Sequence, residues 1–156
     1  MNIDMEAIGH IQSVFANPEC GGRQPNIDGR KGQIIIYEQF AAGLEGLEAF
    51  SHIYALYYFH RQSDVSLKAQ PCFDPTVKHG IFASRYSSRP NHIGMSVLTV
   101  NEIRGNVIHC SDIDVVNGTP LLDIKPYVKQ FDHMSNPVCG WYDHVDWDVV
   151  NKDKAG

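Results

Sequence analysis

The chain has 156 residues, of which 43% are hydrophobic and 20% are charged, and its formal net charge is −5 at pH 7. This length and composition predict one globular domain, or one domain with a short appendage, and exclude a disordered chain. The acidic balance is not that of a typical nucleic-acid-binding protein, although it is compatible with a local basic surface.

The first half of the chain alternates short apolar runs with turns. Strands are predicted over residues 8–15, 33–37 and 52–60, and a helix over residues 38–51. The segments 20–32 and 61–79 are rich in turn-forming or polar residues and are predicted to be loops. A connection as long as the second one is typical of a functional or mobile segment in a compact domain.

The second half continues the β pattern. Residues 80–83 are predicted to form a short strand, and residues 94–100 and 106–110 a hairpin with Gly105 at the positive φ of its turn. Ile113 and Val115 extend the pattern to a tight turn at Asn117-Gly118. Many short strands with one brief helix indicate a mostly β barrel or sandwich over residues 1–132, with a tail of residues 133–156 packed on it.

The sequence gives no sign of a secreted protein or of a metal site. No apolar run is long enough to span a membrane, and residues 1–6 lack the features of a signal peptide, so we expect a cytoplasmic protein. The four cysteines form no Cys-x-x-Cys pair, and the eight histidines show no metal-binding spacing. We therefore expect reduced thiols and no metal.

Two loops concentrate the residues that suit ligand binding. Arg85 and Arg89 lie four residues apart on a loop that Pro90 stiffens, so they suit a carboxylate or phosphate, or they are surface arginines with acidic partners. The turn Asn117–Pro120 offers backbone NH groups, an amide and a hydroxyl, which suit an adenosine or an amino-acid moiety.

Three further residues have two readings each. Asp123 and Lys125 point to one face of an extended segment, where they form either part of a site or a structural ion pair. His60 ends the aromatic strand. It either binds a ligand or is a structural histidine whose ring nitrogens form hydrogen bonds with the backbone. No Gly-x-Ser-x-Gly, Gly-x-Gly-x-x-Gly or phosphate-loop motif occurs, so a nucleotide-like cofactor would not be held in the Rossmann manner.

The motifs Gly80–Arg85, Arg89–Ser96 and Asn117–Tyr127 occur in this order, and together they resemble the TsaA-like family with its TrmO branch of tRNA methyltransferases. Gly46–His52 and Arg23-Gln24-Pro25 match as well, so the resemblance covers roughly residues 6–130. The resemblance implies a small β-barrel unlike the Rossmann methyltransferases, and a homodimer. It also implies S-adenosylmethionine-dependent methylation of N6 of threonylcarbamoyl-adenosine beside the anticodon of a threonine tRNA.

The resemblance also implies site residues. Cofactor contacts are expected from Arg23, Gln24, Pro25, His60, Arg61, Arg85, Met95, Asn117, Gly118, Thr119 and Pro120. The substrate is expected to contact Arg89, Asn91 and Lys125, and the hypothetical proton acceptors are Asp123 and Tyr127.

Three positions depart from the family pattern. His92 stands where a second proline is usual, Asn117 replaces an aspartate, and Cys72 stands where an arginine is common. Two alternatives therefore stand beside the tRNA methyltransferase: a module that binds S-adenosylmethionine or a nucleotide without catalysis, and a methyltransferase with another substrate.

Overall fold

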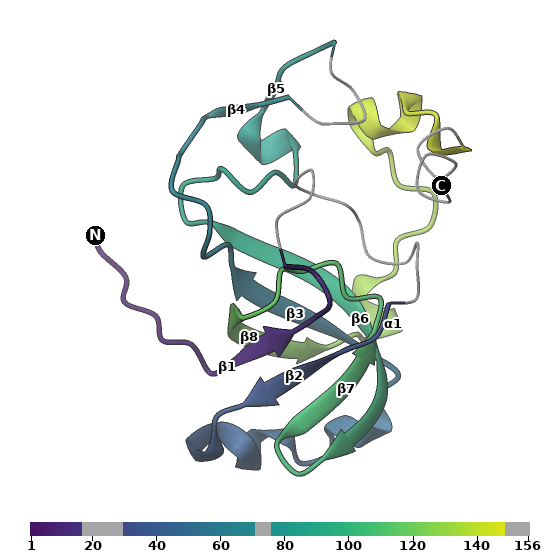
Figure 1. Ribbon diagram of the computed structural model, residues 1–156. Helices are drawn as coiled ribbons and strands as arrows, with labels where there is room; N and C mark the ends of the chain where they lie inside the picture. Colours follow the sequence, from purple (N-terminus) through teal and green to yellow (C-terminus); the bar gives the residue numbers. More distant parts are fainter. Residues whose placement is uncertain (17–29, 71–75, 149–156) are drawn as a thin grey trace.

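The structure is a computed structural model, and it describes residues 1–16, 30–70 and 76–148 (Figure 1). Six strands form a closed barrel in which every neighbouring pair is antiparallel. Around the barrel the order is β1 (Gly9–Gln12), β2 (Gly32–Ile36), β7 (Val107–Ser111), β6 (Ile93–Arg104), β3 (His52–Tyr58) and β8 (Thr119–Pro126). The predicted β-barrel is confirmed, and the sandwich alternative is excluded because the sheet closes on itself.

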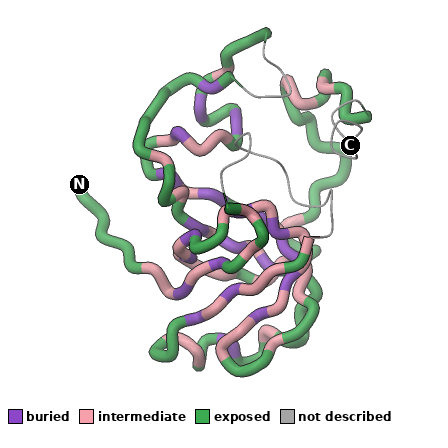
Figure 2. Tube along the Cα trace, viewed as in Figure 1, coloured by how far each residue is buried: buried purple, intermediate pink, exposed green. Residues whose placement is uncertain are grey.

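Alternate residues of the strands fill the barrel. Several aliphatic side chains are fully buried, with 0% of their surface exposed, among them Ile11, Ile34, Ile53, Leu98, Ile108 and Leu121. Figure 2 shows buried positions spread along the barrel strands, whereas the N-terminal segment and most turns are exposed. This period of two is what the β-branched runs in the sequence predict.

The connection from β2 to β3 contains helical turns where the sequence predicted a helix. It holds two 3-10 helices, η1 (Glu38–Leu44) and η2 (Leu47–Ala49), instead of one continuous α-helix. Gly46 has φ +83°, a left-handed conformation that separates the two turns. Leu44 is buried among the barrel residues and anchors this connection to the core.

Two predicted strand segments are not strands. Ile81–Ala83 forms a single 3-10 turn, η3, because Ser84 donates both its backbone NH and its hydroxyl to the carbonyl of Ile81. Ile113 and Val115 are buried, but they lie in a loop. Asp112 interrupts the strand with φ +68°, and its carboxylate accepts a hydrogen bond of 2.7 Å from Thr99 Oγ1.

The two ends of the barrel differ in their connections. The helical end carries η1, η2 and the β6–β7 turn, in which Gly105 has the predicted positive φ. The loop end carries residues 13–16 after β1 and the connections after β3 and β7, and the described part of the connection after β3 includes β4 (Lys68–Ala69), β5 (His79–Gly80) and η3. Figure 1 shows these two ends at the bottom and the top of the view.

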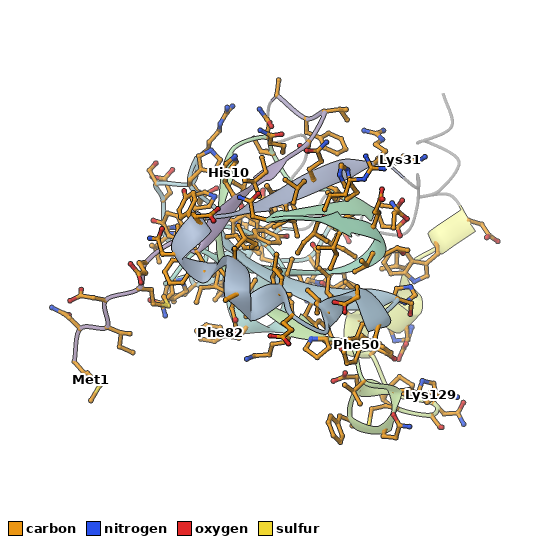
Figure 3. All side chains as sticks on the ribbon, turned by 90° about the horizontal axis from the view of Figure 1, so that it is seen from below. Met1, His10, Lys31, Phe50, Phe82 and Lys129 are labelled. Carbon is orange, nitrogen blue, oxygen red and sulfur yellow. The ribbon has the colours of Figure 1, made fainter. Side chains whose placement is uncertain are left out.

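After β8 the chain leaves the barrel through α1 (Lys129–Asp132) and reaches η4 (Gly140–His144). Figure 3 shows Phe50 and Lys129 on the opposite side of the barrel from His10 and Lys31. In the described part of the tail, Trp141 stacks on His79 at 4.3 Å between ring centroids, and its Nε1 donates to the carbonyl of Ala83 at 2.8 Å. The tail thus packs on the β3–β6 connection, while the domain boundary at residue 132 stays a prediction.

Candidate functional site

His60 and Thr119 meet at the loop end of the barrel. Because β3 and β8 are antiparallel neighbours, the end of β3 lies beside the start of β8, where Thr119 is 98% buried. The Nδ1 atom of His60 lies 3.4 Å from Thr119 Oγ1. The Thr119 hydroxyl in turn donates to the carbonyl of Val116 at 2.7 Å. Two residues far apart in the sequence therefore form one polar cluster.

The turn Asn117–Pro120 is held by its own backbone rather than open to a ligand. The NH of Asn117 donates to the carbonyl of Phe15 and that of Gly118 to the carbonyl of Ile11, both at 2.8 Å. The expectation that this turn offers exposed NH groups is therefore wrong for these two residues. Gly118 has φ +80°, which explains why glycine occupies the turn.

The departure at Asn117 is compatible with this turn. Its Oδ1 accepts a hydrogen bond of 3.1 Å from the NH of Ser13. An aspartate oxygen can accept the same bond, so either residue ties the turn to the segment after β1. The replacement therefore removes a charge and keeps this contact.

The three predicted arginines have different surroundings. Arg61 Nη1 donates to the carbonyl of Ala16 at 2.6 Å. Arg89 Nη1 donates to the carbonyls of Ser84 and Tyr86 at 3.0 and 3.2 Å, so this side chain ties its own loop together. Arg85 is exposed on that loop, and its charge opposes the raised pKa of Tyr54. Burial is the main cause of that raised pKa, followed by the carboxylate of Asp132.

The departure at His92 changes the backbone as well as the side chain. His92 has φ +50°, a conformation that proline cannot adopt. Its ring is buried, its Nε2 lies 3.2 Å from the carbonyl of Asp64, and it packs edge-on against Tyr58. Asn91, the predicted substrate contact just before it, is exposed. A chain with proline here must follow a different path through this loop.

The other predicted residues lie on the outer wall of β6, β3 and β8. Met95 is 44% exposed and sits opposite Leu56, which in turn sits opposite Asp123. Asp123 pairs with Lys125 at 2.9 Å, so the structural ion pair anticipated as one reading is present. Tyr127 packs against Tyr54 at 5.8 Å between ring centroids. These residues form a second group, separate from His60 and Thr119.

One predicted segment of the site and two of the cysteines lie in parts of the chain that the structure does not describe. Arg23, Gln24 and Pro25 lie outside the described residues, as do Cys20 and Cys72. Of the other cysteines, Cys139 is exposed and Cys110 is buried, which raises the pKa of its thiol to about 12. Within the described residues no three metal-ligating side chains come together, and no helix there is long and apolar enough to cross a membrane.

The sequence did not single out a buried polar chain under the loop end. The hydroxyl of Tyr57 lies 3.0 Å from Ser96 Oγ, and Ser96 donates to Asp114 Oδ1 at 3.1 Å. Burial raises the pKa of Tyr57, and the Asp114 carboxylate raises it further. Gly94 leaves room for this tyrosine, since a Cβ there would stand 2.2 Å from its ring. The only sequence signal was the polar Ser96 at an inward position of an apolar strand.

The fold and the site define a closed antiparallel barrel whose polar and cationic residues gather on the loops of one end and on the adjoining wall. Residues 10–133 match the family described as the tRNA-methyltransferase O N-terminal domain. The chain belongs to this family.

Individual relatives agree with this assignment. The chain is 42% identical over 135 residues to a probable S-adenosyl-L-methionine-binding protein of Pyrococcus abyssi, with 86% of this chain and 73% of the relative covered. It is 35% identical to the human tRNA (adenine(37)-N6)-methyltransferase, over 86% of this chain and 32% of the human protein. The crystal structure of TrmO from Pseudomonas aeruginosa superposes with a TM-score of 0.75 at 34% identity, over 90% of this chain and 62% of that chain. The chain thus spans about a third of the human enzyme and less than two thirds of the bacterial one.

Proposed function

We propose that this chain binds S-adenosylmethionine and transfers its methyl group to N6 of an adenosine in tRNA, the threonylcarbamoyl-adenosine beside the anticodon. The family match over residues 10–133 carries this proposal. Relatives whose names describe S-adenosyl-L-methionine-binding proteins and a tRNA (adenine(37)-N6)-methyltransferase support it.

Residues at the loop end and on the adjoining wall suit such a cofactor. S-adenosylmethionine supplies an electrophilic methyl group on a sulfonium, together with an amino-acid carboxylate and an adenosine. The exposed guanidinium of Arg85 is a suitable partner for the carboxylate. Met95 offers an exposed, polarizable surface for the adenine ring, and the rigid turn Asn117–Pro120 shapes the adjoining loop end. Methyl transfer is an in-line displacement that depends mainly on positioning, so it needs no strong nucleophile from the protein.

The experiment that tests the proposal has two parts. Calorimetric titration with S-adenosylmethionine measures binding, and labelled methyl incorporation measures turnover on tRNA that carries threonylcarbamoyl-adenosine. The proposal predicts binding in the micromolar range and incorporation that requires the modified tRNA. Binding without incorporation into any tRNA or small metabolite would instead support the non-catalytic module. Incorporation into another acceptor would support a different substrate.

The substrate and assembly predictions belong to this proposal. Asn91 is exposed and Lys125 is solvent-accessible beside Asp123, so we expect both side chains to contact the tRNA, and we expect the affinity to fall with salt. Arg89, the third predicted contact, donates from Nη1 to the carbonyls of Ser84 and Tyr86 in its own loop. Exposed apolar side chains after β8, namely Phe131, Met134 and Val138, support the proposed homodimer. Sedimentation at two protein concentrations tests the dimer. The cytoplasmic location stays a prediction.

A further inference from the structure

The hydrogen bonds around Thr119 determine which nitrogen of His60 carries the proton. A threonine hydroxyl has one hydrogen, and that of Thr119 is donated to the carbonyl of Val116 at 2.7 Å. In the 3.4 Å contact with His60, Thr119 Oγ1 can therefore only accept. This contact therefore favours the neutral tautomer with the hydrogen on Nδ1, which leaves Nε2 with a lone pair.

This threonine is a fixed partner because its position is set by the fold. Thr119 is 98% buried at the start of β8, and its backbone NH also donates to Val116. His60 itself is exposed and held by a tight turn in which its NH donates to the carbonyl of Tyr58 at 2.7 Å. Thr119 thus contacts the ring at Nδ1, and the residue as a whole is exposed at the loop end.

The electrostatic surroundings keep this imidazole neutral near pH 7. Desolvation is the main cause that lowers the pKa of His60 below its ordinary value of 6.5, and the neighbouring charge of Arg61 lowers it further. Thr119, which contacts the ring, has no titratable side chain, and neither do its neighbours in residues 116–120. A neutral histidine that donates a hydrogen bond from one ring nitrogen and keeps a lone pair on the other has the properties of a general base.

We propose that Nε2 of His60 is the proton acceptor in the methyl transfer, an inference that rests on the proposed function. As the methyl carbon leaves the sulfonium, the N6–H bond breaks and its electron pair stays on the nitrogen. The proton passes to Nε2, which gives an imidazolium, a methylated N6 and a neutral thioether. The exposed ring then releases the proton to water.

The geometry favours His60 over the two acceptors that the sequence put forward. The carboxylate of Asp123 is paired with Lys125 at 2.9 Å and also accepts a hydrogen bond from the NH of Ile124. Each oxygen of this carboxylate therefore already accepts from a donor of its own segment. The phenolic hydroxyl of a tyrosine such as Tyr127 is a weaker proton acceptor than the free nitrogen of a neutral imidazole.

The first test needs neither cofactor nor tRNA. Long-range ¹H–¹⁵N NMR of the ring nitrogens reports the tautomer and the pKa of each histidine in the free protein. We expect the His60 signals to show hydrogen on Nδ1 and a pKa below 6.5. Thr119→Val should remove the preference for this tautomer, whereas Thr119→Ser should keep it. A predominance of hydrogen on Nε2 in the unmodified protein would overturn the proposal.

The second test is kinetic. His60→Gln should lower kcat by roughly 10²- to 10⁴-fold, with the calorimetric Kd for S-adenosylmethionine unchanged within about threefold, a change worth under 1 kcal/mol. In the unmodified protein kcat should fall as the pH drops through the lowered pKa of His60, because the protonated ring cannot accept. The matched control is His109→Gln on β7, which should leave kcat unchanged.

The outcomes separate this inference from the proposed function. If the unmodified protein methylates tRNA and His60→Gln keeps its kcat, His60 is not the acceptor although the function stands. If His60→Gln raises Kd or KM without a change in kcat, His60 binds the cofactor or substrate only. A large loss in Asp123→Asn or Tyr127→Phe alone would assign the proton transfer to that residue. If the unmodified protein incorporates no methyl group into tRNA, the proposed function itself is wrong, and the role of His60 in it falls with it.

Discussion

At the helical end of the barrel the connections are tied to the core and to the strands. Leu44 is buried from the segment of η1, and the two-residue turn between β6 and β7 is fixed to β2, since Asn106 Nδ2 donates to the carbonyl of Ile36 at 2.7 Å. At the loop end the connection after β3 carries His60, Arg61 and Arg85. The same six strands thus support one end that serves stability and another that presents reactive groups.

The largest effect should come from breaking the helical end. Leu44→Ala should lower the free energy of unfolding by about 2–5 kcal/mol, because it leaves a cavity against the core. The affinity of the folded protein for S-adenosylmethionine should not change. Chemical denaturation and calorimetry measure the two quantities.

The matched control lies at the loop end. Leu67 is exposed, so Leu67→Ala should change the free energy of unfolding by no more than about 0.5 kcal/mol. If Leu44→Ala weakened cofactor binding in the folded protein, the two ends would not be independent.

The second effect should appear at the loop end alone. Arg85→Ala removes an exposed guanidinium that we expect to bind the cofactor carboxylate. A hydrogen bond to a charged group contributes about 1.5–3 kcal/mol, so the Kd for S-adenosylmethionine should rise roughly 10- to 150-fold.

Arg104 supplies the comparison at the helical end. It is an exposed arginine paired with Glu102 at 2.7 Å next to the β6–β7 turn. Arg104→Ala should leave the Kd for the cofactor as it is. Equal losses of affinity in the two variants would mean that overall charge, rather than a site at the loop end, governs binding.

The sequence predicted the helical end better than the loop end, for a physical reason. The hairpin around Gly105 and the strand that contains Ile34 follow local rules of turn chemistry and burial period. Ile113 and Val115 are just as apolar, but the left-handed Asp112 takes them out of the ladder, and a short polar residue gives little warning of this.

The arrangement of the site residues was even harder to predict from local sequence rules. His60 and Thr119 were each identified from the chain, but their contact depends on the pairing of β3 with β8. That pairing shifts register between Leu56 and Tyr57, and no local sequence rule reveals such a shift. The sequence therefore identified both groups of residues but could not tell that Asp123 and His60 belong to different ones.

The third effect concerns the contact between the C-terminal tail and the loop end. Trp141→Phe keeps an aromatic ring against His79 but removes the hydrogen bond from Nε1 to the carbonyl of Ala83. Loss of one hydrogen bond costs about 1 kcal/mol, so amide exchange around η3 should speed up roughly fivefold. Exchange in β2 and β7 should stay as it was. Faster exchange throughout the barrel would show that the tail stabilises the whole domain.

The smallest effect concerns the ion pair on the wall. Lys125 and Asp123 are both solvent-accessible, so Lys125→Ala should change the free energy of unfolding by no more than about 1 kcal/mol. If Lys125 contacts a phosphate, the variant should bind tRNA more weakly and lower the slope of log K against log salt by about 1. Filter binding over a range of salt concentrations measures this slope. Arg104→Ala should keep the original slope, because its guanidinium lies at the helical end beside Glu102. If Lys125→Ala kept the slope of the unmodified protein, Lys125 would not contact a tRNA phosphate. The phosphate contacts would then have to come from the loops at the loop end.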